Sequence, residues 1–145
     1  MDGDGWTWCA QGHRHWGRFG AAGLLLWHND YVLLQLRAAW SHHGGTWGLL
    51  GGARNGTETA EEAAQREALE EAGLSPGSYE IVGRYVDDHG GWSYTTVVAR
   101  TEVPILPTAL TAETTEVRWV PADRIDLLPL HPGFAATWGV LRSIA

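Results

Sequence analysis

Residues Gly52 to Leu74 of this 145-residue chain read GARNGTETAEEAAQREALEEAGL. This pattern predicts a helix over about residues 59–72. Thr59 followed by Glu62 fits a capping box, in which each side chain bonds the backbone N–H of the other residue. At the other end, Gly73 and a proline three residues later are typical of a helix stop, because glycine adopts the left-handed conformation easily and proline cannot continue a helix.

Three glutamates of this helix share one face. Each residue advances by roughly 100°, so Glu70 and Glu71 lie about 60° and 40° to either side of Glu67. Like charges at this spacing destabilise a helix, and moving them towards a sheet raises the cost. We therefore expect a cation against this face. The same face carries Ala60, Ala63 and Ala64, which predicts close packing on a neighbouring element.

The carboxylates also indicate which cation to expect. Carboxylate oxygens are hard ligands, which favours Mg²⁺ or Mn²⁺ over zinc. The alternative for these positions alone is an acidic helix face that contacts only solvent.

The remaining sequence predicts an α+β fold with a mixed sheet. Two apolar runs, residues 21–27 and 31–37, are separated by a polar triplet that favours a hairpin turn. Residues 1–18 carry three tryptophans without any period, so we expect an irregular N-terminal arm. Further strands are expected at 79–86, 92–103 and 116–120, and a second helix at 134–144.

Composition predicts one cytoplasmic domain that spans residues 1–145. The acidic start lacks the pattern of a secretory leader, and no apolar stretch is long enough to span a membrane. A single cysteine excludes an internal disulfide. The net charge is −7 and the chain has no lysine, so a basic surface for duplex nucleic acid is not expected. The acidity is concentrated in residues 58–71, which hold six glutamates and one arginine.

The spacing around the predicted helix resembles the Nudix box, GX5EX7REUXEEXGU, at every fixed position. Only Ala68 is smaller than the aliphatic residue that is usual there. The chain is therefore similar to the Nudix hydrolases, whose fold is an α/β/α sandwich around a mixed β-sheet. The matching residues are Gly52, Glu58, Arg66, Glu67, Glu70, Glu71, Gly73 and Leu74.

This resemblance implies an activity. Nudix hydrolases cleave a diphosphate bond in a nucleoside diphosphate linked to another group, by attack of water at phosphorus with divalent metals bound. Residues 86–92 lack the residues diagnostic of members that prefer ADP-ribose, dinucleoside polyphosphates or NADH. We therefore expect a small nucleotide substrate, either a nucleoside triphosphate or another nucleoside diphosphate derivative.

The resemblance also implies roles for individual residues. It assigns metal binding to Glu67, Glu70, Glu71 and the backbone carbonyl of Gly52, with Mg²⁺ or Mn²⁺ as the cofactor. Glycine at Gly51 and Gly52 lets the backbone approach a phosphate closely. By the same resemblance, Glu58 and Arg66 brace the loop against the helix.

The general base and the substrate contacts lie partly outside the box. Some Nudix hydrolases use a glutamate of the box as the base, and others use a glutamate from a later loop. We expect Glu113 rather than Glu116, because a loop residue can swing whereas a strand residue has a fixed face. Arg37 ends a predicted strand and could bind a substrate phosphate. The alternative is that these side chains contact only solvent.

Two other functions are compatible with a Nudix fold. One is a nucleotide sensor that binds without hydrolysis, and the other is an allylic diphosphate isomerase, which needs a cysteine in its pocket. The complete set of acids favours hydrolysis, and Cys9 lies in the N-terminal arm. Cys9, His13 and His15 are residue types that bind zinc, but with one cysteine and no second pair we do not expect zinc there. The chain could form a homodimer.

Overall fold

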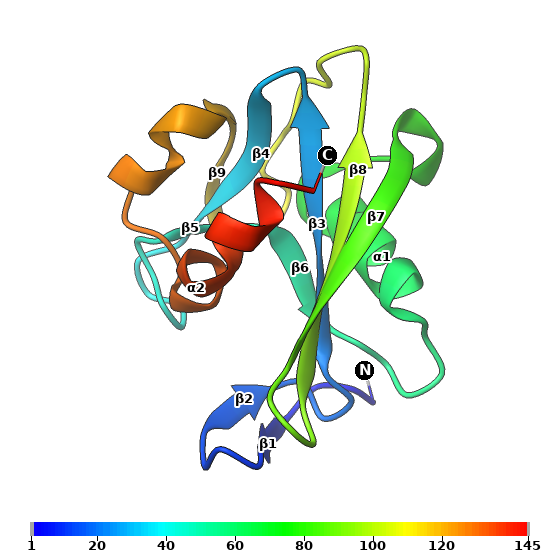
Figure 1. The fold of residues 1–145 in the computed structure, drawn as a ribbon, viewed down its shortest axis with the longest axis vertical. Coiled ribbons are helices and arrows are strands. Elements are labelled where there is room, and N and C mark those ends of the chain that lie inside the picture. The colour runs from blue at the N-terminus through cyan, green and yellow to red at the C-terminus, as the bar shows by residue number, and fades with distance from the viewer. Residues whose placement is uncertain (1, 145) are drawn as a thin grey trace.

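The computed structural model describes residues 2–144, and its main feature is a mixed β-sheet between two helices (Figure 1). Helix α1 (Ala60–Ala72) covers one face of the sheet and helix α2 (Pro132–Leu141) covers the other. This arrangement confirms the expected α/β/α sandwich. Two short 3-10 helices are η1 (Pro76–Ser78) and η2 (Ala122–Leu127). Within residues 2–144 the main sheet has seven strands: β3 (Ala21–His28), β4 (Tyr31–Arg37), β5 (Trp47–Gly48), β6 (Leu50–Ala53), β7 (Glu80–Asp88), β8 (Ser93–Arg100) and β9 (Thr114–Pro121).

The sheet divides between its central strand, β3, and the next strand, β4. β3 pairs in parallel with β8 along its whole length, and all other pairs are antiparallel. β3 contacts β4 only next to their turn, and β6 pairs with the first half of β3 instead. Because β3 and β4 separate in this way, β6 pairs with β3 and β5 pairs with β4, and β6 lies against α1.

Helix α1 begins and ends where the sequence predicts. The Thr59 hydroxyl accepts a bond from the Glu62 N–H at 3.1 Å, and the Glu62 carboxylate accepts one from the Thr59 N–H at 2.8 Å. Gly73 ends the helix with a φ of 70°, in the left-handed region that glycine tolerates. No helix within the described residues is long and apolar enough to cross a membrane.

Small side chains bring α1 close to the sheet. Ala63, Ala64 and Ala68 are fully buried, and they pack with Leu24 of β3 and Leu50 of β6 in one apolar cluster. A second cluster, on the opposite face, joins α2 to β3 and β8. The side chains on this face of α1 are small, so the helix lies close to the sheet. The carboxylates on the same face can therefore also reach the sheet.

The N-terminal segment differs from the prediction. Instead of an irregular arm, residues 6–16 form a two-stranded hairpin from β1 (Trp6–Trp8) and β2 (Arg14–Trp16). Its turn is attached to the β7–β8 turn by a hydrogen bond from the Ala10 N–H to the Gly90 carbonyl, at 2.7 Å. Strands of three residues have too little alternation to be recognised in a sequence.

Candidate active site

The candidate active site lies where the second half of α1 faces β6. The Glu71 carboxylate points into this contact and accepts a hydrogen bond from the Gly51 N–H at 2.8 Å. The same carboxylate oxygen lies 3.5 Å from the Gln35 side-chain nitrogen. Helix α1, β6 and β4 therefore meet at Glu71.

The two glycines of β6 are required by close approach. A Cβ at Gly51 would clash with the backbone carbonyl oxygen of Ala22 on β3, and one at Gly52 would lie 2.7 Å from a carboxylate oxygen of Glu67. Gly51 thus lets β6 pair closely with β3, and Gly52 lets the Glu67 carboxylate approach the backbone of β6.

The carboxyl groups at this contact are electrostatically unfavourable by themselves. The pKa of Glu71 is raised to about 8, mainly by burial and secondly by the charge of Glu67. Burial also raises the pKa of Glu67, although the adjacent Arg66 opposes that shift. Two largely buried carboxylates that repel each other beside the backbone of Gly51 and Gly52 form a set of hard oxygen donors. These residues fit a divalent cation such as Mg²⁺ or Mn²⁺.

Arg66 is the centre of an ion-pair network at the edge of this contact. Its guanidinium donates to both oxygens of Glu58, at 2.7 and 2.9 Å, and to the Ala53 carbonyl at 3.0 Å. It also lies 3.0 Å from Glu67 and 3.4 Å from Glu70. The bond from Arg66 is the main reason that the pKa of Glu58 is lowered. This network links the loop before α1 to the helix, as the predicted supporting roles of Glu58 and Arg66 require.

Glu70 differs from the other two acids of the predicted metal set. Its side chain is about half exposed (49%), whereas that of Glu67 is only 16% exposed. Glu70 therefore faces solvent at the rim, next to Arg66. All three carboxylates lie on the predicted side of α1, but only Glu67 and Glu71 reach β6.

The region of Glu113 is connected to Glu71 through two polar side chains. The Thr114 hydroxyl donates a hydrogen bond to the side-chain oxygen of Gln35 at 2.6 Å, and the side-chain nitrogen of Gln35 lies 3.5 Å from Glu71. Glu113 itself lies in an exposed turn just before β9, and its backbone carbonyl accepts a bond from Ala38. Glu116, in contrast, lies on β9 and pairs with Arg118 at 2.7 Å. Glu113 is thus the less constrained of the two candidate bases.

Arg37 lies at the end of β4 beside a group of histidines. Its Nε donates to the His42 carbonyl at 2.8 Å, and its charge acts on Glu71. His42, His43 and His131 form a row of ring contacts, with centroid distances of 4.0 and 4.7 Å. Burial lowers the pKa of His131 to about 4, with His43 as the next cause. Arg37 is therefore held by the His42 carbonyl, beside a row of histidines in which burial lowers the pKa of His43 and of His131.

Three residues of this region were missed by the sequence analysis. Gln35 is buried on β4, Tyr94 is partly buried on β8, and both approach the acids of α1. His131 caps α2 beside His43. Each reaches the site through a contact between distant parts of the chain. A polar residue inside an apolar strand run was the only available signal, and it applied to Gln35.

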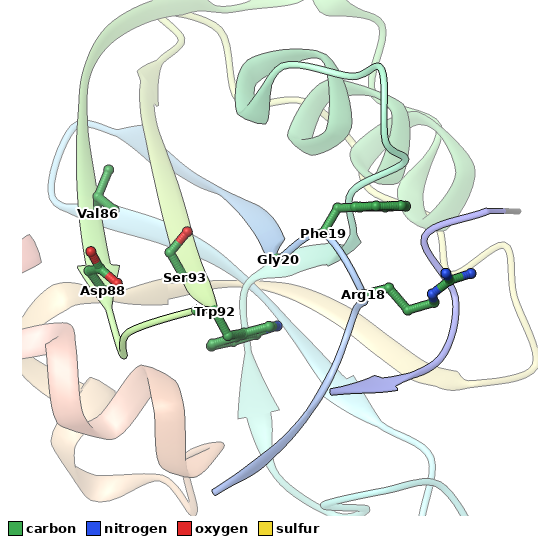
Figure 2. Close-up of a pocket in the computed structure, with 8 residues that line it drawn as sticks. Arg18, Phe19, Gly20, Val86, Asp88, Trp92 and Ser93 are labelled. Carbon is green, nitrogen blue, oxygen red and sulfur yellow. The ribbon is translucent and has the colours of Figure 1, made fainter. Parts of the chain in front are cut away.

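A surface hollow lies away from these acids (Figure 2). It has a volume of about 380 Å³. Figure 2 shows Val86, Asp88 and Ser93 on the β7–β8 side, Arg18 and Phe19 on the other side, and Trp92 between them. None of its lining residues belongs to the predicted site. The hollow instead borders the N-terminal hairpin.

Comparisons with known proteins agree with this geometry. A family model described as "NUDIX domain" matches residues 17–139. A Mycobacterium tuberculosis protein, named provisionally as 8-oxo-dGTP diphosphatase 3, is 50% identical over 98% of this chain and 70% of its own length. A Bifidobacterium longum fusion of a nucleoside triphosphate pyrophosphatase with a Nudix hydrolase is 44% identical, over 94% of this chain and 30% of its own length.

A solved structure extends the comparison to three dimensions. The crystal structure of the M. smegmatis Nudix hydrolase RenU superimposes with a TM-score of 0.88 at 47% identity. The match covers 98% of this chain and 94% of RenU. The similarity therefore includes the N-terminal hairpin region as well as the sandwich.

Proposed function

The chain belongs to the NUDIX domain family, and we propose that it is a divalent-metal-dependent hydrolase that cleaves a diphosphate bond of nucleoside triphosphates. One observation carries the proposal. Glu71 is held by the Gly51 N–H beside Glu67, so two repelling carboxylates face the glycine backbone of β6. Such an arrangement is stabilised when a cation lies between the carboxylates and a phosphate.

The acids of α1 supply the proposed metal ligands. Glu67, Glu70 and Glu71 would hold Mg²⁺, or Mn²⁺ in its place, together with the Gly52 carbonyl. When bound, the cation neutralises charge on the diphosphate oxygens and makes water more acidic. The half-exposed position of Glu70 at the rim suits a ligand that is shared with solvent or substrate.

Protein groups would bind the substrate and remove the proton. Glu113 is proposed as the general base that takes the proton from the attacking water, because its exposed turn precedes Thr114, which is connected to Glu71 through Gln35. Arg37 would bind a substrate phosphate, and the backbone at Gly51 and Gly52 lets phosphates approach. Glu58 and Arg66 would keep the loop and helix in place.

The relatives support the substrate class. The M. tuberculosis and B. longum relatives carry names that refer to 8-oxo-dGTP and to nucleoside triphosphates. We infer that this chain also acts on a small nucleotide of this class, with an oxidised purine triphosphate among the candidates. The intact acids and the braced loop support hydrolysis rather than binding alone.

A nucleotide panel tests the proposal. Purified protein would be assayed for product release with nucleoside triphosphates, 8-oxo-dGTP, ADP-ribose and a dinucleoside polyphosphate, each with Mg²⁺ and with Mn²⁺. We expect the highest kcat/KM for a triphosphate with Mg²⁺. Glu71→Gln should lower this activity at least about a hundredfold, whereas Glu61→Gln, on another face of α1, should retain it. Hydrolysis of ADP-ribose alone would contradict the substrate class.

A further inference from the structure

Four residues that bind soft metals converge outside the candidate active site. Cys9, His13 and His15 lie in or next to the N-terminal hairpin, and His89 lies in the turn between β7 and β8. One ligand atom from each of them lies within 4.8 Å of the others. The first three residues are neighbours in the sequence, and only the fold places His89 next to them.

Two of the three imidazoles have buried nitrogens without a partner. Among the described residues, His15 Nε2 and His89 Nδ1 are shielded from solvent and make no hydrogen bond. An unsatisfied buried polar atom is energetically unfavourable, so two in one cluster indicate a partner that these atoms would bind. Cys9 is buried next to them as a free thiol.

The His89 ring is already oriented as a metal ligand. Its Nε2 lies 3.0 Å from the Asp87 carboxylate, which holds the ring proton on that nitrogen. The lone pair is then on Nδ1, which is buried and makes no hydrogen bond among the described residues. A carboxylate behind a histidine is the usual outer partner of a zinc ligand.

We propose that Cys9, His13, His15 and His89 bind one structural zinc ion that joins the N-terminal hairpin to the β7–β8 turn. One thiolate and three imidazoles make a closed tetrahedral set, which favours zinc and leaves no position for substrate. In such a site the ligand atoms are roughly 3.4–3.7 Å apart, by the usual zinc distances. The ligand atoms, which lie within 4.8 Å of one another, would have to draw closer when zinc binds, and His13 is the exposed member of the four.

Most of the charge of the zinc ion would be compensated in this arrangement. Zn²⁺ displaces the Cys9 proton to solvent when the zinc–sulfur bond forms, and the three histidines bind as neutral rings. One thiolate leaves a net charge of +1 on the site. The Asp87 carboxylate at His89 partly compensates that charge.

The proposed zinc site supports a wall of the molecule that carries aromatic side chains. The His15 ring stacks on Trp92 with centroids 3.9 Å apart and planes 6° apart, and Trp92 lines the hollow of Figure 2. On the same hairpin, Trp6 contacts the His42 ring at 5.6 Å, next to Arg37. Zinc at this position would thus fix the hairpin against both regions.

Metal analysis of the purified full chain tests the proposal. The protein would be equilibrated in buffer with excess Mg²⁺, so that the acidic site holds magnesium, and zinc would be measured by mass spectrometry. We expect one zinc per chain. Cys9→Ser and His89→Gln should each lower the content at least fivefold, whereas the controls His28→Gln and Glu71→Gln should keep it. Wild-type protein without zinc, or variants that retain it, would overturn the proposal.

Cobalt supplies a second readout that does not depend on the variants being stable. Metal-free wild-type protein would be titrated with Co²⁺ in the presence of excess Mg²⁺. A tetrahedral cobalt site with one thiolate gives a sulfur-to-metal absorption band, and we expect this band at one equivalent. Its absence would show that Cys9 is not a ligand and would overturn the proposal, even if the substituted chains failed to fold.

Discussion

Glu71 accepts a hydrogen bond from the backbone N–H of Gly51 at 2.8 Å, so the carboxyl group with the strongly raised pKa is also the one tied to β6. The bond to the backbone favours the charged form, while burial and Glu67 oppose it more strongly. The balance leaves Glu71 ready to bind a cation but not stably charged without one.

Glu71→Gln should lower kcat at least about a hundredfold. The substitution keeps the size and helix propensity of the side chain but removes the charge that the cation requires. Steady-state kinetics over a range of Mg²⁺ concentrations measure the change. A loss below tenfold with unaltered metal affinity would show that Glu71 is not a ligand.

Removal of divalent metal should abolish turnover. Excess EDTA is expected to stop product release, and added Mg²⁺ or Mn²⁺ should restore it, because the repelling carboxylates of α1 cannot stabilise phosphate charge alone. Activity that persists in EDTA would contradict the metal-dependent mechanism.

Glu113→Gln should lower kcat with little change in KM. If Glu113 takes the proton from water, the acidic limb of the profile of kcat against pH should disappear with it. Glu116→Gln on β9 is the matched control, because its side chain pairs with Arg118. A greater loss at Glu116 would reverse the assignment. No loss at either would return the base to Glu67 or Glu70.

Arg66→Met should destabilise the fold by about 2 kcal/mol. It removes the partner of the largely buried Glu58 and leaves that carboxylate without its main charge compensation. Urea unfolding measures the change. Arg84→Met is the control, because Arg84 lies 4.0 Å from Glu61 at the surface and should change stability by less than about 0.5 kcal/mol. Equal effects of the two substitutions would contradict a bracing role for Arg66.

His131 should make the fold less stable as the pH falls from about 6.5 to about 4. Its pKa in the folded chain is about 4, below the ordinary value of 6.5, so in this range the unfolded chain binds the proton and the folded chain does not. Above about 6.5 both states are neutral and no penalty exists.

The effect of His131 is isolated by His131→Asn. Asparagine can still cap α2 by accepting the Gly133 N–H, but it does not titrate. The difference in unfolding free energy between the two proteins should change between pH 7.5 and pH 5, in favour of the variant at low pH. A difference that does not vary with pH would contradict the assignment.

Local sequence patterns predicted those parts of the fold that depend on neighbouring residues. The caps of α1 at Thr59 and Gly73 are such features, and both have the predicted geometry. The hairpin of residues 6–16 was missed because its strands are short and its turn is held by a bond from Ala10 to Gly90, far along the chain. Contacts of that kind leave no period in the sequence.

The same distinction applies to the candidate site. The spacing of the acids on α1 follows from helix geometry, so their common side was predictable. Gln35 and Tyr94 come from two other strands, and only the paired sheet brings them to the acids. His131 comes from the start of α2 and contacts His43. Their contribution therefore required the structure.

The parallel pairing of β3 with β8 has a consequence for the order of folding. Ala21 pairs with Tyr94, so the chain between them, α1 included, must be synthesised before the central pair of strands can close. Long-range pairing of this kind slows folding. The contacts of Glu71 with Gly51 and Gln35 involve only segments that precede β8, so they can form before that closure. A nascent chain can complete the sandwich only after β8, β9 and α2 have left the ribosome.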